Sequence, residues 1–133
     1  MSSNDIDKLE ELVKSLPENA KLRLALGKSY LSVGNVEEAR RELETAITLN
    51  PTDPECFLKL GNVVAEDQDF EMAIVYYQKA LALDPFYVEA LYCLGMAYVD
   101  TRQNDDVEKV IRRLEQLHPL WAQGLKSYYS KIL

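Results

Sequence analysis

The stretch that decides the fold is residues 54–87, which read PECFLKLGNVVAEDQDFEMAIVYYQKALALDPFY. Apolar residues recur in it at steps of three and four on both sides of a polar break, a spacing that predicts two amphipathic helices joined by a turn. Proline cannot donate an intrahelical hydrogen bond and disfavours helical geometry in the residue before it, so we expect the second helix to end before Pro85. The stretch is therefore interpreted as one helix-turn-helix unit.

The same unit recurs on both sides of this stretch. Four of the five prolines are spaced 34 residues apart, namely Pro17, Pro51, Pro85 and Pro119. Three of the five glycines keep the same step and each follows a leucine, namely Gly27, Gly61 and Gly95. Since glycine and proline are rare in this chain, such alignment indicates an array of one repeated unit.

Composition and charge restrict the function. The chain has 133 residues, of which 47% are hydrophobic and 28% charged, as in an ordinary globular domain and unlike a disordered chain. Its net charge of −7 repels nucleic-acid phosphate and anionic membranes. We therefore expect neither a nucleic-acid partner nor a membrane partner.

The sequence shows neither a targeting signal nor paired cysteines. The first residues lack a basic segment followed by an apolar one, and no stretch has the length and hydropathy of a membrane span, so we expect a cytoplasmic protein. Cys56 and Cys93 have no second cysteine or histidine at metal-ligand spacing. We interpret both as small core hydrophobes with free thiols.

The repeats resemble those of the tetratricopeptide-repeat family, whose signature is W-x2-L-G-x2-Y, then A-x3-F, then P over 34 residues. The first unit matches it with Arg23, Leu26, Gly27, Tyr30, Ala39, Leu43 and Pro51. The second unit has Phe57, Leu60, Gly61, Val64, Ala73, Tyr77 and Pro85. The third unit has Leu91, Leu94, Gly95, Tyr98, Val107, Ile111 and Pro119.

This resemblance implies an all-α fold, a right-handed α-solenoid of helix-turn-helix repeats in a single domain over residues 1–133. We expect an N-terminal capping helix at residues 5–16, which is half a repeat. The full repeats should occupy residues 20–53, 54–87 and 88–121, and a C-terminal capping helix residues 122–133. Val107 and Leu114 replace small residues of the other units, so the third repeat should pack differently.

The chain shows no sign of catalysis. It has no glycine-rich phosphate loop, no nucleophile elbow and no cluster of metal ligands. Its one histidine, His118, precedes Pro119 and is interpreted as a helix-terminal residue. We therefore expect no enzyme activity, no cofactor and no metal.

The resemblance further implies a concave groove lined by the first helix of each repeat, in which a peptide segment or amphipathic helix of another protein would bind. The family's inward positions correspond to Lys21, Leu24, Lys28 and Leu31, then Glu55, Leu58, Asn62 and Glu66, then Glu89, Tyr92, Met96 and Asp100. We expect an apolar track along Leu24, Leu58, Tyr92 and Met96. The alternative is that these residues are merely tolerated on a repeat surface.

Two details of the track predict how a ligand would bind. Asn62 can form a hydrogen bond with a peptide backbone in the middle of the track. Lysines border the beginning of the track and carboxylates its end, so charge would orient the ligand.

Some members of the family clamp the Glu-Glu-Val-Asp tail of heat-shock chaperones. The clamp positions are occupied here by Leu24, Lys28, Lys59, Glu89 and Cys93. Glu89 would repel a terminal carboxylate where attraction is needed, so we expect this chain not to bind such tails.

A second function remains open, in which the domain is a self-associating assembly element that uses its end helices. Apolar and aromatic residues crowd the last 13 positions, namely Trp121, Tyr128, Tyr129, Ile132 and Leu133. They could pack on the third repeat or pair with a second copy. We expect a monomer, with a homodimer through the C-terminal helix as the alternative.

Overall fold

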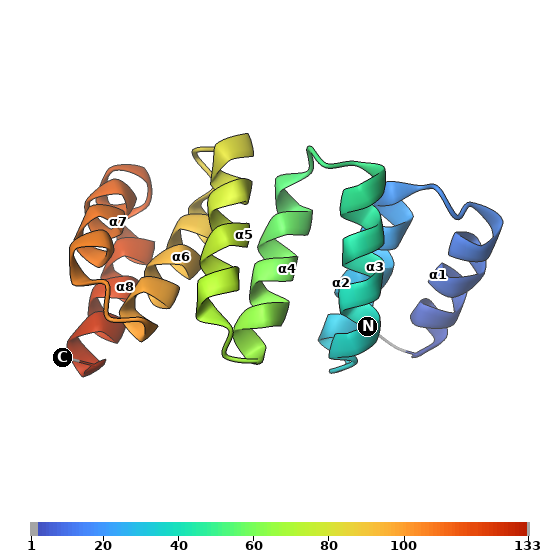
Figure 1. The fold of residues 1–133 in the computed structure, drawn as a ribbon, viewed down its shortest axis with the longest axis horizontal. Coiled ribbons are helices and arrows are strands. Elements are labelled where there is room, and N and C mark those ends of the chain that lie inside the picture. Colours follow the sequence, from blue (N-terminus) through green and yellow to red (C-terminus); the bar gives the residue numbers. More distant parts are fainter. Residues whose placement is uncertain (1–2, 133) are drawn as a thin grey trace.

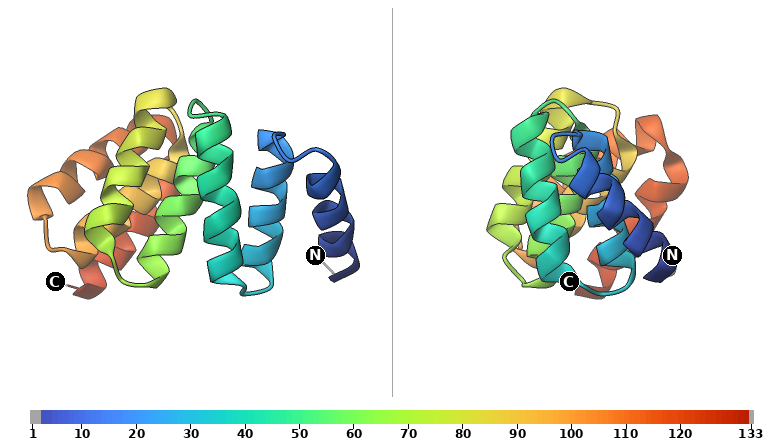
Figure 2. Two further views of the ribbon diagram at one scale, coloured as in Figure 1. Left: turned by 45° about the vertical axis from the view of Figure 1, so that its right-hand side comes forward. Right: turned by 90° about the vertical axis from the view of Figure 1, so that its right-hand side faces the viewer.

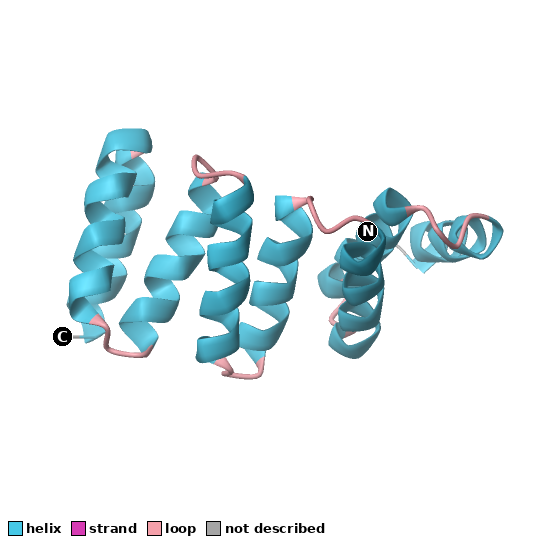
Figure 3. Ribbon diagram, turned by 45° about the horizontal axis from the view of Figure 1, so that its top comes forward, coloured by secondary structure: helices cyan, strands magenta, loops and turns pink. Residues whose placement is uncertain are grey.

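The structure is a computed structural model that describes the backbone of residues 3–132 and the side chains of residues 5–132. This part of the chain forms eight helices and no strand (Figure 3). The helices are α1 (Ser3–Ser15), α2 (Ala20–Ser32), α3 (Val36–Leu49), α4 (Pro54–Glu66), α5 (Phe70–Leu83), α6 (Val88–Asp100), α7 (Asn104–Leu117) and α8 (Pro119–Ile132).

The helices form a two-layered array of pairs. Each helix packs against the next one along the chain, so that α2 with α3, α4 with α5 and α6 with α7 make three full repeats. Figure 1 views the array from the side of the second helices, with α2 behind α3 and α8 behind α7. The unpaired helices α1 and α8 lie at opposite ends (Figure 2). The expected all-α repeat fold is confirmed.

Polar side chains fix where several helices begin. The side chains of Asn19, Asp53 and Asp69 each accept a hydrogen bond from a backbone N–H in the first turn of the helix that follows. Such caps satisfy donors that have no partner inside the helix, each contributing about 1 kcal/mol. Pro54 begins α4, where its missing N–H costs nothing.

The signature glycines allow the two helices of a repeat to approach closely. A Cβ atom at Gly27 would lie 2.9 Å from the Leu43 side chain, and one at Gly61 would lie 2.4 Å from the Tyr77 ring. Ala39 and Ala73, the small residues of the second helices, are fully buried. Larger side chains at these positions would force the helices apart.

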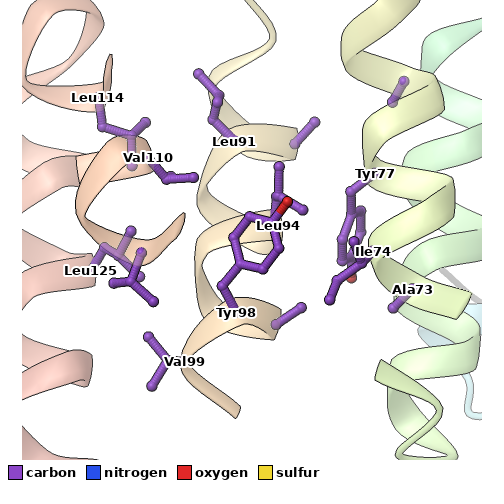
Figure 4. Close-up of a cluster of buried hydrophobic side chains, with 14 of the residues drawn as sticks. Ala73, Ile74, Tyr77, Leu91, Leu94, Tyr98, Val99, Val110, Leu114 and Leu125 are labelled. Carbon is purple, nitrogen blue, oxygen red and sulfur yellow. The ribbon is translucent and has the colours of Figure 1, made fainter. Parts of the chain in front are cut away.

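The third repeat packs differently, as the sequence predicted. A Cβ atom at Gly95 would lie 2.4 Å from Leu125 of α8 and 3.0 Å from Val110. In the first two repeats, by contrast, the closest side chain to the glycine comes from the repeat's own second helix. Figure 4 shows α6 in the middle, with Tyr77 on one side of it and Leu125 on the other. Helix α8 thus closes the end of the core.

The end helices differ slightly in length from those expected. Helix α1 spans Ser3–Ser15 where 5–16 was expected, and α8 begins at Pro119 instead of residue 122. The early start has a local cause, because the His118 N–H ends α7 by donating to Leu114 O and Pro119 fits the first helical position. Leu133, which was assigned to the last helix, lies outside the described residues.

Candidate functional site

The twelve residues expected in a groove all lie on the first helices α2, α4 and α6. Three of them are exposed, namely Lys21, Lys28 and Glu66. Seven are partly exposed, namely Leu31, Glu55, Asn62, Glu89, Tyr92, Met96 and Asp100. We call the surface made by these ten residues the inner face. The remaining two, Leu24 and Leu58, are buried.

The burial of Leu24 and Leu58 corrects the expected apolar track. Leu24 is only 8% exposed and packs in one cluster with Cys56 and Leu60 of α4, and Leu58 is 0% exposed. Contact between neighbouring repeats causes this burial, since α6 packs against α4 and covers Leu58. These two leucines therefore hold the repeats together and cannot contact a ligand.

A hollow of about 460 Å³ lies between α2 and α4, towards the carboxyl-terminal ends of both helices. We call it the α2–α4 hollow. Eight residues line it, namely Lys28, Leu31, Ser32, Gly34, Val36, Lys59, Asn62 and Glu66. Half of them belong to the expected set. The hollow thus combines aliphatic side chains with an amide, two ammonium groups and a carboxylate.

Tyr77 reaches this face from the second layer of helices. Its ring passes α4 at Gly61, where a side chain would collide with it, and its hydroxyl donates to Asn62 Oδ1 at 2.7 Å. Burial, followed by the influence of Cys93, raises the pKa of Tyr77 well above its ordinary value, so the hydroxyl remains a donor. The bond occupies the Asn62 oxygen and leaves the amide N–H groups to meet an acceptor.

Lys28, which was expected at the basic end of the groove, forms an ion pair with Glu55 of the next repeat. Lys28 Nζ lies 2.8 Å from Glu55 Oε2, and both side chains are partly exposed. Such a pair contributes little to stability, because water screens it. Lys28 therefore does not stand apart as the basic end of the groove, and a carboxylate of a ligand would have to compete with Glu55.

Two expected residues of α6 contact the C-terminal helix. Tyr92 packs edge to face against Trp121, with ring centroids 5.0 Å apart. Asp100 accepts a hydrogen bond from the Tyr128 hydroxyl. This bond, more than burial, raises the pKa of Tyr128 to about 12. Asp100 is thus engaged within the chain and is a weaker candidate for contact with a ligand than the sequence predicted.

Cys93 follows Tyr92 on α6 and interacts with the Tyr77 side chain of α5. Its side chain is partly exposed, and desolvation together with Glu89 raises the pKa of its thiol to about 11. A thiol with this pKa stays protonated near neutral pH and is a poor nucleophile. Cys56 is buried with a pKa raised to about 12, mainly by desolvation, in keeping with a packing role.

Some residues of the site were missed by sequence reasoning. Lys59 and Val36 line the α2–α4 hollow although neither was among the twelve residues expected in the groove. Lys59 gave a signal, since it occupies one of the clamp positions of the family members that bind chaperone tails. Val36 gave no such signal in the sequence, because it belongs to the second helix and its position at the hollow depends on the conformation of the turn at Gly34.

The described residues contain no group of three or more histidine, cysteine, aspartate or glutamate side chains that could hold a metal ion. None of the eight helices has the length and apolar character that crossing a membrane requires.

Comparison with protein families identifies the repeat. A family model described as "Tetratricopeptide repeat" matches residues 6–54 and 24–88, and a second one with the same description matches residues 76–109. The chain belongs to the tetratricopeptide repeat family. Tetratricopeptide repeats form protein-interaction modules and are generally not enzymes, and this chain is built as such a module.

Individual relatives are similar over most of this chain. The TPR repeat-containing protein YpiA of Bacillus subtilis (strain 168) is 30% identical over 133 residues, which covers 96% of this chain and 31% of that protein. The peroxisomal targeting signal receptor of Kluyveromyces lactis is 31% identical over 98 residues, covering 73% of this chain and 17% of the receptor. The chain thus spans less than a third of the length of these relatives.

Solved structures confirm the architecture. The crystal structure of MamA superimposes with a TM-score of 0.81 and 25% sequence identity, covering 96% of this chain and 81% of that one. The array of α1–α8 is therefore an arrangement that also occurs in a solved protein structure.

Proposed function

We propose that this protein binds an extended segment of a partner protein on the inner face, with the α2–α4 hollow as the main contact. The observation that carries the proposal is Asn62, whose amide oxygen is held by Tyr77 while its amide N–H groups remain available. An extended peptide presents backbone carbonyls at regular intervals, and an amide donor can bind one of them whatever the side chains are.

The rest of the hollow suits a peptide of mixed chemistry. Leu31 and Val36 offer aliphatic surface to a side chain of the ligand. Lys59 and Glu66 place opposite charges at the same hollow, so polar side chains on the ligand would set its direction. The sequence relationship to a peroxisomal targeting signal receptor supports the proposal, since that relative is named as the receptor of a targeting signal.

Selection of binding peptides tests this function. A random peptide library is screened against the whole chain, and the affinity of a selected peptide is measured by fluorescence polarisation. Asn62→Ala should weaken binding about tenfold, which corresponds to one hydrogen bond of about 1.4 kcal/mol. Asn104→Ala is the matched control, because Asn104 is exposed at the start of α7 and lies outside the hollow. Equal affinities for wild type and Asn62→Ala would refute the role of Asn62.

Glu89 predicts which peptides the inner face does not bind. It is a carboxylate on α6, and it adds to burial in raising the pKa of the neighbouring Cys93. We infer that a peptide ending in Glu-Glu-Val-Asp does not bind, because its terminal carboxylates would face this charge. Saturable binding of that peptide to wild type would contradict this inference.

Self-association is the second candidate, and exposed apolar side chains favour it. Leu120 is 79% exposed and Ile132 is 43% exposed, both on α8. Trp121, Tyr128 and Tyr129, by contrast, pack against the core and leave less apolar surface for a second copy. Light scattering over a concentration series distinguishes the two candidates, since a constant monomer mass excludes dimer formation.

A further inference from the structure

A second hollow, of about 430 Å³, lies between α6 and α8 and has a different chemistry from the first. Five residues line it, namely Tyr92, His118, Leu120, Trp121 and Gly124. We call it the aromatic hollow. No carboxylate or ammonium group is among these described lining residues. It therefore favours an uncharged side chain over a charged one.

Three rings define the walls of the aromatic hollow. Trp121 meets Tyr92 edge to face at 5.0 Å between ring centroids and meets His118 in the same manner at 6.2 Å. These contacts fix the orientation of the three rings before any ligand arrives. A preformed apolar wall loses little conformational entropy when a side chain binds against it.

Gly124 is the observation that points to a ligand. The other helical glycines are required by packing, since a Cβ atom at Gly27, Gly61 or Gly95 would lie within 2.9 Å of a side chain. A Cβ atom at Gly124 would make only an ordinary contact, 3.4 Å from the Tyr92 ring. Glycine inside a helix costs about 1 kcal/mol relative to alanine. At Gly124 the packing does not require glycine, and a Cβ atom there would lie in ordinary contact with the Tyr92 ring that lines the aromatic hollow.

The two hollows lie on the same side of the array but at opposite ends of the first helices. Figure 1 shows that α2, α4, α6 and α8 all run in the same direction. The α2–α4 hollow is near the carboxyl-terminal ends of its helices, whereas Tyr92 and Gly124 lie in the first halves of α6 and α8. A segment that contacts both hollows must therefore cross the inner face diagonally.

Helix dimensions give the length of that crossing. Two steps between neighbouring first helices amount to about 20 Å at interaxial distances near 10 Å. The offset along the helices adds about 10 Å for six or seven residues at 1.5 Å each. The diagonal is then about 22 Å, which six or seven extended residues span at about 3.4 Å per residue.

We propose that the aromatic hollow is a second subsite for the same partner segment and takes a bulky uncharged side chain, phenylalanine, tryptophan or leucine. That side chain lies six or seven residues from the ligand residue that contacts Asn62. The inference rests on the proposed peptide binding and adds the chemistry and spacing of a second anchor. A large apolar side chain in a preformed pocket is the usual form of such an anchor.

Small probes test the subsite without knowledge of the partner. N-acetylphenylalaninamide is titrated into the ¹⁵N-labelled chain, and the signals of the Gly124 amide and of the indole N–H of Trp121, the single tryptophan, are followed by NMR. We expect saturable shifts at both signals and at least a fivefold weaker response to N-acetylargininamide. Equal or stronger binding of the arginine probe would overturn the assigned side-chain class, and absence of saturable shifts would overturn the subsite.

Two substitutions provide the matched comparison. Gly124→Leu adds a side chain that fills the aromatic hollow, and it should weaken probe binding at least tenfold. Gln123→Leu adds the same side chain at the neighbouring exposed position and should leave the affinity unchanged. An unchanged affinity in a folded Gly124→Leu variant, with folding checked by circular dichroism, would contradict the proposal.

Library peptides separate this inference from the proposed function. Peptides selected on wild type should share a bulky apolar residue, and Gly124→Leu should weaken their binding. If such peptides bind but are insensitive to Gly124→Leu, the subsite is refuted and groove binding stands. If no peptide binds while the phenylalanine probe does, the proposed function fails and the hollow remains a site for a side chain.

Discussion

At the scale of single residues, the turn inside each repeat places one residue at positive φ. Only in the first repeat is that residue a glycine. Gly34 has φ 83°, and the equivalent residues of the next two repeats, Gln68 and Arg102, have φ 61° and 59°. These values lie in the left-handed region, which costs a residue with a side chain about 1 kcal/mol and glycine almost nothing. The second and third turns therefore hold strain that the first avoids.

Gln68→Gly should raise the free energy of unfolding by about 1 kcal/mol, since it relieves this strain. The same substitution inside a helix, Gln123→Gly, should lower it by about 1 kcal/mol, because glycine disfavours helix. Urea unfolding followed by circular dichroism measures both. Destabilisation by Gln68→Gly would show that the side chain at this turn contributes more than its backbone costs.

The glycines offer a second comparison. Gly61→Ala brings a methyl group within 2.4 Å of the Tyr77 ring, so it should destabilise the fold by about 1–3 kcal/mol through overpacking. Gly124→Ala meets only an ordinary contact and should stabilise α8 by about 1 kcal/mol. Thermal unfolding of both variants is the measurement, and a shift of the same sign in the two would contradict the packing described.

Sequence reasoning located the repeat but not the exposure of each inward residue. The 34-residue spacing of Gly27, Gly61 and Gly95 predicted where the helices approach one another closely, because close approach requires a small residue. The burial of Leu58 could not be predicted, since it depends on the distance between neighbouring repeats. The hydrogen bond from Tyr77 to Asn62 was also missed, because it joins two layers across a glycine.

At the scale of elements, α8 is both the cap of the core and the wall of the aromatic hollow. Leu125 is 0% exposed and fills the notch at Gly95, whereas Ile132 on the same helix is 43% exposed. The start of this helix at Pro119 was not predicted, because proline ended the earlier second helices with a loop after it. Here no loop follows, and α8 begins directly after His118.

Leu125→Ala should cost about 2–5 kcal/mol, since it leaves a cavity between α6, α7 and α8. Ile132→Ala should change stability by less than about 1 kcal/mol, because that side chain is largely in water. Native-state hydrogen exchange should show faster exchange in α8 for Leu125→Ala alone. Equal protection of α8 in both variants would mean that Leu125 does not anchor the helix.

The bond between Tyr128 and Asp100 predicts a pH dependence. The pKa of Tyr128 is raised to about 12 in the folded chain and is about 10 when the chain is unfolded. The stabilisation is therefore complete below pH 10 and is lost between pH 10 and 12, where only the unfolded form releases the proton. Tyr128→Phe should lose less stability than wild type between pH 9 and 11, as measured by urea unfolding. A slope equal to that of wild type would contradict the bond.

At the scale of the whole molecule, the fold provides a surface and a few side chains give it a function. The repeats stack through buried residues such as Leu24, Leu58 and Leu125, which leave the inner face free to vary. Two hollows of different chemistry lie on that side of the array, one of mixed aliphatic and polar character and one aromatic. Function on a repeat scaffold is decided by such surface residues and not by the fold itself.

The most direct test of this account is to map a library-selected peptide on the ¹⁵N-labelled chain by NMR. We predict that the largest shifts fall on residues of α2, α4, α6 and α8, including Asn62 and Gly124. Shifts confined to the outer surfaces of α3, α5 and α7, with the inner face unchanged, would contradict the central claim.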